Sequence, residues 1–221
     1  MKKGFKMDWD ARYSIDDYLF GKDPAQALLR NEEHLVVEGN TLVIADGEGR
    51  NSVYLAKKGF KVTATDNSTV AHQKAKALAN SQNVEVNYKL EDFFDINWSE
   101  TQYDNVVGIC FQFIPPNLID DVLMGLRSAT KKGGTLFIHG YTPDQLSYGT
   151  GGPKDISLMY TKDTFTRLFH HSEIFKLEVY EATIHEGVGH SGKSAMIDFC
   201  LLYTSDAADE GLGVDLGGRR I

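Results

Sequence analysis

The stretch TLVIADGEGRNSVYLAKKGFKVTATD, residues 41–66, constrains the fold more than any other part of this chain. It opens with a short apolar run, residues 42–45, which is bounded by turn residues and is typical of a buried strand in a parallel sheet. A glycine-containing turn follows, and residues 51–58 then have the spacing of a helix that Gly59 ends. Residues 60–64 form a second strand that leads to an acid. This order of elements predicts a βαβ unit that binds a nucleoside.

Two glycines and one acid of this unit predict how the nucleoside is held. Gly47 and Gly49 lack a Cβ, so the backbone can approach a ligand closely and adopt dihedral angles closed to other residues. Asp66 lies 17 residues after Gly49 (66 − 49), at the carboxyl end of a strand, where a carboxylate can accept hydrogen bonds from both ribose hydroxyls. Phosphate binding is less favoured, because Ser52 stands where a G-x-G-x-x-G pattern needs its third glycine. A tight turn in any α/β protein is the alternative interpretation.

Length, charge and cysteine content exclude several classes of protein. The 221 residues suit one domain, and the net charge of −8 argues against a nucleic-acid partner. No apolar run approaches the roughly 20 residues of a membrane helix, and the first ten residues lack the apolar core of a secretory signal. There are two cysteines, Cys110 and Cys200. A disulfide framework is therefore not expected, Cys110 is most simply a core residue, and we expect a cytoplasmic protein.

The rest of the chain predicts a mostly parallel sheet with a final antiparallel hairpin. Helices and further strands alternate after the first unit: helix 70–81, strand 84–88, strand 103–113, helix 118–131, strand 135–139 and helix 161–169. Alternation of this kind implies right-handed crossovers and a single α/β domain. Strands 175–185 and 193–199 are joined by a turn so short that they must pair antiparallel. We therefore expect a seven-stranded, Rossmann-like sheet.

An aromatic-rich segment precedes the βαβ unit. Its aromatic side chains are followed by a short helix, for which Asp23 and Pro24 are the expected N-cap and first residue. Such a lead-in is either a packing strap or a lid over a pocket, and for each aromatic residue alone core packing is favoured. We assign residues 1–34 to this lid or strap, within a domain of residues 1–199.

Six parts of the chain together follow the pattern of a known family. They are WDARYSIDDYLFGKDP, ADGEGRNSVYLAKKGFKVTATD, the Pro-Pro pair after residue 114, KKGGTLFI, YGTGGPKDISLMYT and EGVGHSGKSAMIDF. The set resembles class I S-adenosylmethionine (SAM) methyltransferases of the small tellurite-resistance-like branch, over nearly all of residues 8–199. The resemblance implies SAM as cofactor, S-adenosylhomocysteine as product, and in-line methyl transfer to a small-molecule acceptor.

The resemblance also implies which residues bind the cofactor. Asp66 would take the ribose hydroxyls, Asp92 the adenine amino group, and Phe93 would pack on the adenine ring. Three positions depart from the family pattern. Ala45 replaces the usual first glycine, Val43 stands where many methyltransferases have an acid, and Gln112 stands where this branch often has a different polar residue, which leaves the acceptor open. The full set expected at SAM is Ala45, Gly47, Gly49, Asn51, Asp66, Asn67, Asp92, Phe93, Phe111 and Gln112.

The acceptor pocket is expected at the carboxyl edge of the sheet, where ligands bind in open α/β folds. The turn of residues 186–191, the loop after the strand that ends at His139, and the N-terminal strap all reach this edge. His190 is the candidate catalytic residue, although it is equally well a solvated turn histidine, and His139 is a base or a bonding partner of its own loop. The basic and aromatic side chains expected at a small anionic acceptor are Arg12, Tyr13, Tyr18, Tyr148, Lys154 and His190.

The acceptor itself stays open at this stage. Tellurite, selenite, a thiol or a small metabolite are candidates, and an anionic acceptor needs no general base whereas a neutral amine or hydroxyl does. A nicotinamide-dependent oxidoreductase and a non-catalytic regulator that binds SAM or a nucleoside are the alternative classes. We expect no metal, because His185 and His190 have no third ligand in the sequence pattern. We also expect no membrane or nucleic-acid partner, and a monomer or weak homodimer.

The last residues have a different character from the rest. CLLYTSDAADE and GVDLGGRRI resemble one reading frame of a common sequencing-library adapter. We therefore expect residues 200–221 to be a non-native, disordered tail, with Leu201 and Leu202 able to extend the last strand by chance. A natural tail rich in Gly and Asp is the alternative.

Overall fold

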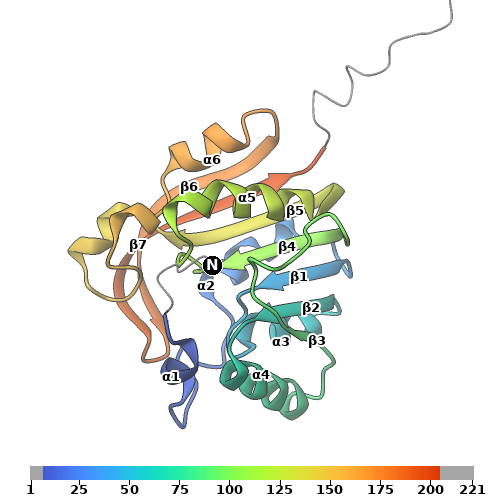
Figure 1. The fold of residues 1–221 in the computed structure, drawn as a ribbon, viewed down its shortest axis with the longest axis vertical. Coiled ribbons are helices and arrows are strands. Elements are labelled where there is room, and N and C mark those ends of the chain that lie inside the picture. Colours follow the sequence, from blue (N-terminus) through green and yellow to red (C-terminus); the bar gives the residue numbers. More distant parts are fainter. Residues whose placement is uncertain (1–6, 205–221) are drawn as a thin grey trace, which may run out of the picture.

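A seven-stranded sheet crosses the molecule in the order β3-β2-β1-β4-β5-β7-β6 (Figure 1). The computed structural model describes residues 7–204. The strands are β1 (Asn40–Ile44), β2 (Lys61–Asp66), β3 (Asn87–Leu90), β4 (Tyr103–Ile109), β5 (Thr130–Tyr141), β6 (Glu173–Glu186) and β7 (His190–Leu202). The five strands β1 to β5 pair in parallel, and β7 is antiparallel to both β5 and β6. The expected Rossmann-like sheet with an antiparallel hairpin is confirmed.

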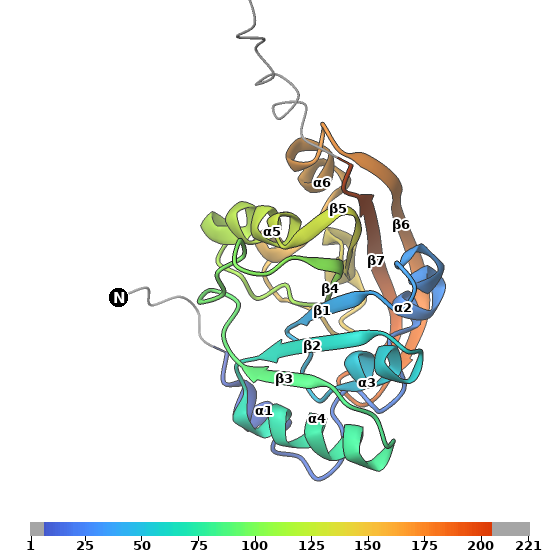
Figure 2. The same cartoon turned by 90° about the vertical axis from the view of Figure 1, so that its right-hand side faces the viewer.

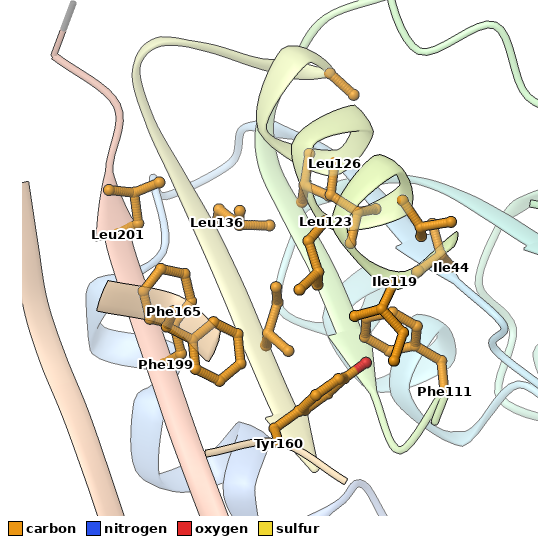
Figure 3. Packing of buried hydrophobic residues seen from close by; sticks show 14 of the residues in the cluster. Ile44, Phe111, Ile119, Leu123, Leu126, Leu136, Tyr160, Phe165, Phe199 and Leu201 are labelled. Carbon is orange, nitrogen blue, oxygen red and sulfur yellow. The ribbon is translucent and has the colours of Figure 1, made fainter. Parts of the chain in front are cut away.

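Helices cover both faces of this sheet (Figure 2). The helices are α1 (Trp9–Tyr13), α2 (Gln26–Asn31), α3 (Arg50–Lys57), α4 (Thr69–Ser81), α5 (Ile119–Ser128) and α6 (Lys162–Leu168). Alternation along β1 explains the two layers, because Leu42 and Ile44 pack with α5 whereas Val43 packs with α2 and α3. The face under α5 and α6 is rich in buried rings and leucines (Figure 3). There Phe165 and Phe199 stack with their ring centroids 4.4 Å apart.

The chain leaves the sheet where local conformation forces it to. The strand expected at 103–113 ends at Ile109, because the next residue, Cys110, has φ of +54° and breaks the extended backbone. The short helix expected to start at Pro24 begins instead at Gln26, with Ala25 as its N-cap, so that assignment was wrong. Ser68 caps α4 by accepting a hydrogen bond from the Ala71 N–H (3.1 Å).

Three residues assigned to the tail belong to the domain. Cys200, Leu201 and Leu202 continue β7, and the first two pair with Phe137 and Leu136 of β5. Cys200 and Leu201 are fully buried, so the boundary expected at residue 199 was too early. The later part of the adapter-like tail, residues 205–221, lies outside the described residues. Within residues 7–204, the helices are too short or too polar to cross a membrane.

Candidate functional site

Strained turns follow the carboxyl ends of β1 and β4. At these two strands the chain reverses its direction of travel through the sheet. Ala45 follows β1 with φ of +48°, and Cys110 follows β4 with φ of +54°. A left-handed conformation at a residue other than glycine costs on the order of 1 kcal/mol or more, and such residues cluster at ligand sites. These turns open a crevice at the switch point, where ligands bind in folds of this class.

We call the hollow at the ends of β1, β2 and β3 the acidic cleft. Five carboxylate side chains line it: Asp46, Glu48, Asp66, Glu91 and Asp92. Most residues predicted to hold the cofactor also line it, namely Ala45, Gly47, Asn51, Asp66, Asn67, Asp92 and Phe93. The structure therefore brings together in space most of the set that the resemblance implied.

Asp66 is oriented by the turns on either side of it. Its Oδ2 accepts a hydrogen bond from the Gly47 N–H (2.8 Å), and its Oδ1 accepts one from the Ser68 N–H (2.9 Å). Burial raises the pKa of Asp66, while these two N–H groups oppose the rise. Next to it, the Asn67 amide donates to Asp92 Oδ2 (2.8 Å). Each oxygen of Asp66 keeps a further lone pair for a ligand hydroxyl.

Sequence reasoning missed two carboxylates inside the glycine turn itself. Asp46 is buried, and it accepts hydrogen bonds from the Ser52 hydroxyl (2.5 Å) and the Ser52 N–H (3.2 Å). Burial raises the pKa of Asp46 to about 7. Glu48 accepts hydrogen bonds from the Leu19 N–H (2.7 Å) and the Lys74 ammonium (2.9 Å). The sequence did contain a signal for them, because Asp46 and Glu48 flank the same glycine, Gly47.

Three predicted cofactor residues lie outside the acidic cleft. A Cβ at Gly49 would lie 2.8 Å from Ala75 of α4, so this glycine permits close packing of helices. Phe111 is fully buried in the core under α5. Gln112 donates from Nε2 to the backbone oxygens of Tyr141 (2.9 Å) and Leu158 (3.1 Å), at the wall of a second cavity.

The N-terminal strap fills much of the acidic cleft. Trp9 stacks on Tyr13 with ring centroids 5.5 Å apart, and Tyr13 meets Phe20 edge to face at 6.3 Å. A Cβ at Gly47 would lie 2.7 Å from the Tyr13 hydroxyl, so the ring occupies the space that this glycine leaves. The enclosed free volume is about 60 Å³. A nucleoside needs several hundred cubic ångströms, so the strap has to move when one binds.

We call the second cavity, of about 750 Å³, the loop cavity. Its walls come from α1, the loop after β5, and the β6–β7 turn. Of the six residues predicted at the acceptor, Arg12 and Lys154 line it, and Tyr13 lines the acidic cleft instead. Four side chains line both hollows and so mark where they meet: Trp9, Phe20, Cys110 and Phe113.

The other three predicted acceptor residues hold the scaffold together. The Tyr18 hydroxyl donates to the Lys74 backbone oxygen (3.0 Å), and the Tyr148 hydroxyl donates to Glu181. His190 is 2% exposed, and the residues of its turn that line the loop cavity are its neighbours. The His190 ring packs on Tyr141 with centroids 5.1 Å apart. The structure thus does not gather the predicted acceptor residues in one place.

A buried ion pair fixes the turn that carries His190. Arg50 Nη2 lies 2.7 Å from Glu186 Oε2, and the Gln26 N–H donates to Glu186 Oε1 (2.9 Å). His190 Nδ1 lies 3.6 Å from the same carboxylate. Burial alone would raise the pKa of Glu186, but His190 and Arg50 hold it well below its ordinary value. This cluster ties the β6–β7 turn to α3 and to the strap.

A second buried pair lies behind the junction of the two hollows. His139 Nδ1 is 2.6 Å from Asp198 Oδ1, and both side chains are almost wholly buried. Burial alone would lower the pKa of His139, but Asp198 and Cys110 raise it to about 10. Asp198 accepts further hydrogen bonds from Arg30 (2.7 Å), Asn31 (2.8 Å) and the Tyr180 hydroxyl (3.2 Å). No group of three or more His, Cys, Asp and Glu residues within 7–204 is arranged to hold a metal ion.

The chain is similar to methyltransferases in sequence and in fold. Residues 42–134 match the family described as a methyltransferase domain. One similar structure is described by the words "Conversion of a Disulfide Bond into a Thioacetal Group during Echinomycin Biosynthesis". Its TM-score is 0.73 at 16% identity, and the match covers 96% of this chain and 98% of that one. TehB from Haemophilus influenzae has a TM-score of 0.65 at 18% identity, covering 80% of this chain and 61% of that one.

A third similar structure is that of a SAM-dependent methyltransferase from Methanosarcina mazei. Its TM-score is 0.63 at 16% identity, and the match covers 80% of this chain and 98% of that one. No curated protein sequence matches this chain significantly. At these identities the structural likeness establishes the shared fold.

Proposed function

We propose that this chain, which is an S-adenosylmethionine-dependent methyltransferase, methylates a small molecule held in the loop cavity. SAM is the cofactor, and the acidic cleft is the site that we assign to it. The assignment of individual residues rests on the geometry described above. Asp66 would bind the ribose, Asp92 the adenine amino group and Phe93 the adenine ring. The space beside Gly47, which the Tyr13 hydroxyl takes in this structure, would become free for the ligand when the strap moves.

The charge of the acidic cleft is the observation that carries this proposal. SAM has a sulfonium and an ammonium cation but a single carboxylate, so it is a net cation. Among the described residues that line the cleft, Arg50 is the one Lys or Arg, and it is already paired with Glu186 at 2.7 Å. Glu48 is also offset, by Lys74 at 2.9 Å, so Asp46, Asp66, Glu91 and Asp92 are the carboxylates of the cleft that are left to face a cationic ligand.

The same charge disfavours the oxidoreductase alternative. A nicotinamide dinucleotide carries a diphosphate, which the carboxylates of the cleft would repel. The pattern of glycines also lacks the third glycine that a dinucleotide pyrophosphate uses, because Ser52 occupies its place and bonds to Asp46. Both observations favour SAM over a dinucleotide.

The two hollows share a wall. This arrangement supports transfer of a methyl group from a cofactor in the acidic cleft to an acceptor in the loop cavity. When bound, SAM supplies a methyl group on a sulfonium, which is an activated leaving group. The protein then needs mainly to hold the acceptor in line and to exclude water, and such positioning supplies about 7–11 kcal/mol. The rings of Trp9, Phe20 and Phe113 line the junction, and such apolar surfaces would exclude water from it when both ligands are bound.

The chemical class of the acceptor is the second part of the proposal. Arg12 and Lys154 line the loop cavity and would attract an anion such as tellurite, selenite or a thiolate. Asp155 also lines it, and glycines of the loop after β5 leave space for a small ligand. A role as a regulator that binds SAM without turnover is the remaining alternative.

Two measurements test this function. Calorimetry should show binding of SAM and S-adenosylhomocysteine and no binding of NADH under the same conditions. Mass spectrometry should then detect S-adenosylhomocysteine formation with at least one acceptor in a panel of tellurite, selenite, thiols, amines and phenols. Binding of NADH in place of SAM would overturn the assignment, and SAM binding without turnover across the panel would favour the regulator.

A further inference from the structure

The two hollows have linings of opposite charge. Among the described residues that line the loop cavity, Arg12 and Lys154 carry positive charge and Asp155 is the one carboxylate. Asp155 Oδ1 already accepts hydrogen bonds from the Ser157 N–H (2.9 Å) and the Ser157 hydroxyl (2.7 Å). In the acidic cleft the balance is reversed, with five carboxylates and Arg50. The loop cavity is therefore the hollow suited to an anionic ligand.

The two cations of the loop cavity are not committed to an acid of the protein. Within residues 7–204, neither Arg12 nor Lys154 forms an ion pair with an Asp or Glu side chain. Arg12 Nη1 lies 3.2 Å from Met7 Sδ, and its guanidinium lies over the Trp9 ring at 4.9 Å. Both contacts are weaker than a charge-assisted bond to a carboxylate, so both cations can bind the anionic group of a ligand.

The loop that carries Lys154 is anchored to the sheet. Gln145 is 1% exposed, and its Nε2 donates to Thr150 Oγ1 (3.0 Å) and to the Gly151 backbone oxygen (3.2 Å). Its Oε1 accepts a hydrogen bond from the Ala195 N–H on β7 (2.8 Å). Lys154 comes three residues after Gly151, so it belongs to an anchored wall of the cavity and not to the strap, which has to move when a nucleoside binds.

The size and the walls of the loop cavity fit an organic body. Four aromatic rings line it: Trp9, Phe20, Phe113 and Tyr141. The first three are half-buried, so each keeps an accessible surface for edge-to-face or offset contact with a ligand ring. An oxyanion of four heavy atoms, at about 30 Å³ for each water-sized group, takes up on the order of 100 Å³. The cavity has about 750 Å³, so such an ion would leave most of it unfilled.

The cations lie apart from the place where the methyl group would pass. The two hollows meet at four shared side chains, whereas Arg12 and Lys154 line the loop cavity alone. A ligand whose anionic group is bound by these cations therefore presents a different atom to the junction. The anion is then used for recognition, and a second group of the same ligand takes the methyl group.

We propose that the acceptor is an aromatic carboxylate, that Arg12 and Lys154 bind its carboxylate, and that a separate nucleophilic group on its ring is methylated at the junction. This inference rests on the proposed function. With a thiol as that group, a sulfur lone pair forms the new S–C bond, the bond from the methyl group to the sulfonium of SAM breaks, and its electron pair stays on that sulfur. The ordinary pKa of a thiol is about 8.5, so at about pH 9 its proton has already gone to solvent.

The first experiment measures recognition of the carboxylate without turnover. The ligands are 4-(methylthio)benzoate, which has the shape of a methylated product, and its neutral amide. In the wild type, calorimetry should show at least about tenfold tighter binding of the acid than of the amide, with and without S-adenosylhomocysteine. In Arg12→Gln/Lys154→Gln the two affinities should agree within about twofold. Equal affinities in the wild type, or a preference that persists in the double variant, would overturn the proposal.

The controls separate the site from general charge and from misfolding. Lys162→Gln removes the same charge from an exposed position on α6, which does not line the cavity, and should keep the preference of the wild type. Thermal unfolding checks that the double variant folds. Lys154→Gln alone, on the anchored loop, should lower the preference at least about threefold. An unchanged preference in Lys154→Gln, or an equal loss in Lys162→Gln, would count against the assignment.

The second experiment identifies the methylated atom. With SAM at about pH 9, 4-mercaptobenzoate should give the S-methyl product, with kcat/KM at least about tenfold above that of 4-mercaptobenzamide. Both thiols are ionised under these conditions, so the difference reports the carboxylate. Mass spectrometry and NMR locate the new methyl group. A methyl ester would place the carboxylate at the junction and overturn the proposal, as would a higher kcat/KM for selenite than for 4-mercaptobenzoate.

Failure of this inference and failure of the proposed function give different results. If neither SAM nor S-adenosylhomocysteine binds, but the preference for the acid is lost in Arg12→Gln/Lys154→Gln, the cofactor site in the acidic cleft is wrong and the anion site remains. If SAM binds at Asp66 and the acid has no advantage over the amide, the cofactor site remains and the acceptor class is wrong.

Discussion

The acidic cleft and the loop cavity meet at the same four side chains but are built in different ways. The cleft is formed by turns that directly follow β1, β2 and β3, and it carries five carboxylates. The cavity is formed by α1, the end of β4, the loop after β5 and the β6–β7 turn. The cleft is nearly filled by the strap, at about 60 Å³ of free space, whereas the cavity holds about 750 Å³.

Under the proposed function, this difference means that cofactor binding and acceptor selection use separately built parts of the fold. The cleft is charged, local and tied to the sheet, as suits a ligand that does not vary. The cavity is assembled from loops that are distant in sequence, so its shape can change without disturbing the strands beneath. The wall shared by both is supported from behind by the His139–Asp198 pair.

The largest expected effect comes from breaking the support of the shared wall. Asp198→Ala leaves the buried donors of Asn31 and His139, and the partly exposed guanidinium of Arg30, without their acceptor, and should lower the free energy of unfolding by about 3–5 kcal/mol. Urea denaturation measures it. Glu178, the exposed cross-strand partner of Asp198 in β6, is the matched control, and Glu178→Ala should change stability by less than about 0.5 kcal/mol. A similarly small change in the stability of Asp198→Ala would mean that Asp198 and its hydrogen-bond donors do not stabilise the fold together.

The next effect tests the cleft alone. Asp66→Ala removes the carboxylate assigned to both ribose hydroxyls and should weaken SAM binding at least about tenfold, as measured by calorimetry. Asp163→Ala, at an exposed position on α6, should leave the affinity unchanged. Equal SAM affinity in wild type and Asp66→Ala would show that Asp66 does not bind the ribose.

The contrast between the two hollows also explains what the sequence could predict. The cleft follows from one βαβ unit, so the strands, the turn and Asp66 could be predicted from local spacing. The role of Gly49 could not be predicted in the same way, because a glycine needed for packing against Ala75 has the same pattern as one needed for a ligand. His139 lies on β5, Asp198 on β7 and Cys110 directly after β4, and no spacing links them before the sheet forms.

The same limit explains why the residues predicted at the acceptor are not gathered in one place. The turn of His190 does lie at the expected edge of the sheet, because β6 runs in the direction of the parallel strands. Which of its residues face the cavity depends on packing against Arg50 and Tyr141, which are distant in the chain. A one-residue change in register exchanges the buried and the exposed side chains of a strand.

A smaller effect tests how the cavity wall is tied to the cleft. The pKa of Glu186 is below its ordinary value of about 4.3, so its ionisation stabilises the fold above that pH, and the contribution is lost as pH falls through it. Glu186→Gln should therefore be less stable than the wild type at pH 7, and the difference in unfolding free energy should shrink between pH 5.5 and pH 3. Urea denaturation at several pH values measures it. A difference that stays constant with pH would show that the ion pair does not contribute through its charge.

The smallest expected effect is spectroscopic and tests whether the strap is the movable part of the cleft. Trp9 stacks on Tyr13 and lies against Phe113 at 5.0 Å, so displacement of the strap by SAM should change its fluorescence. The other tryptophan, Trp98, packs against Gly125 on α5, and Trp98→Phe leaves Trp9 as the sole reporter. Titration with SAM should then shift the emission, with a midpoint equal to the calorimetric Kd. Because the free space in the acidic cleft is far smaller than a nucleoside, saturation with no change in Trp9 emission would mean that SAM binds outside this cleft.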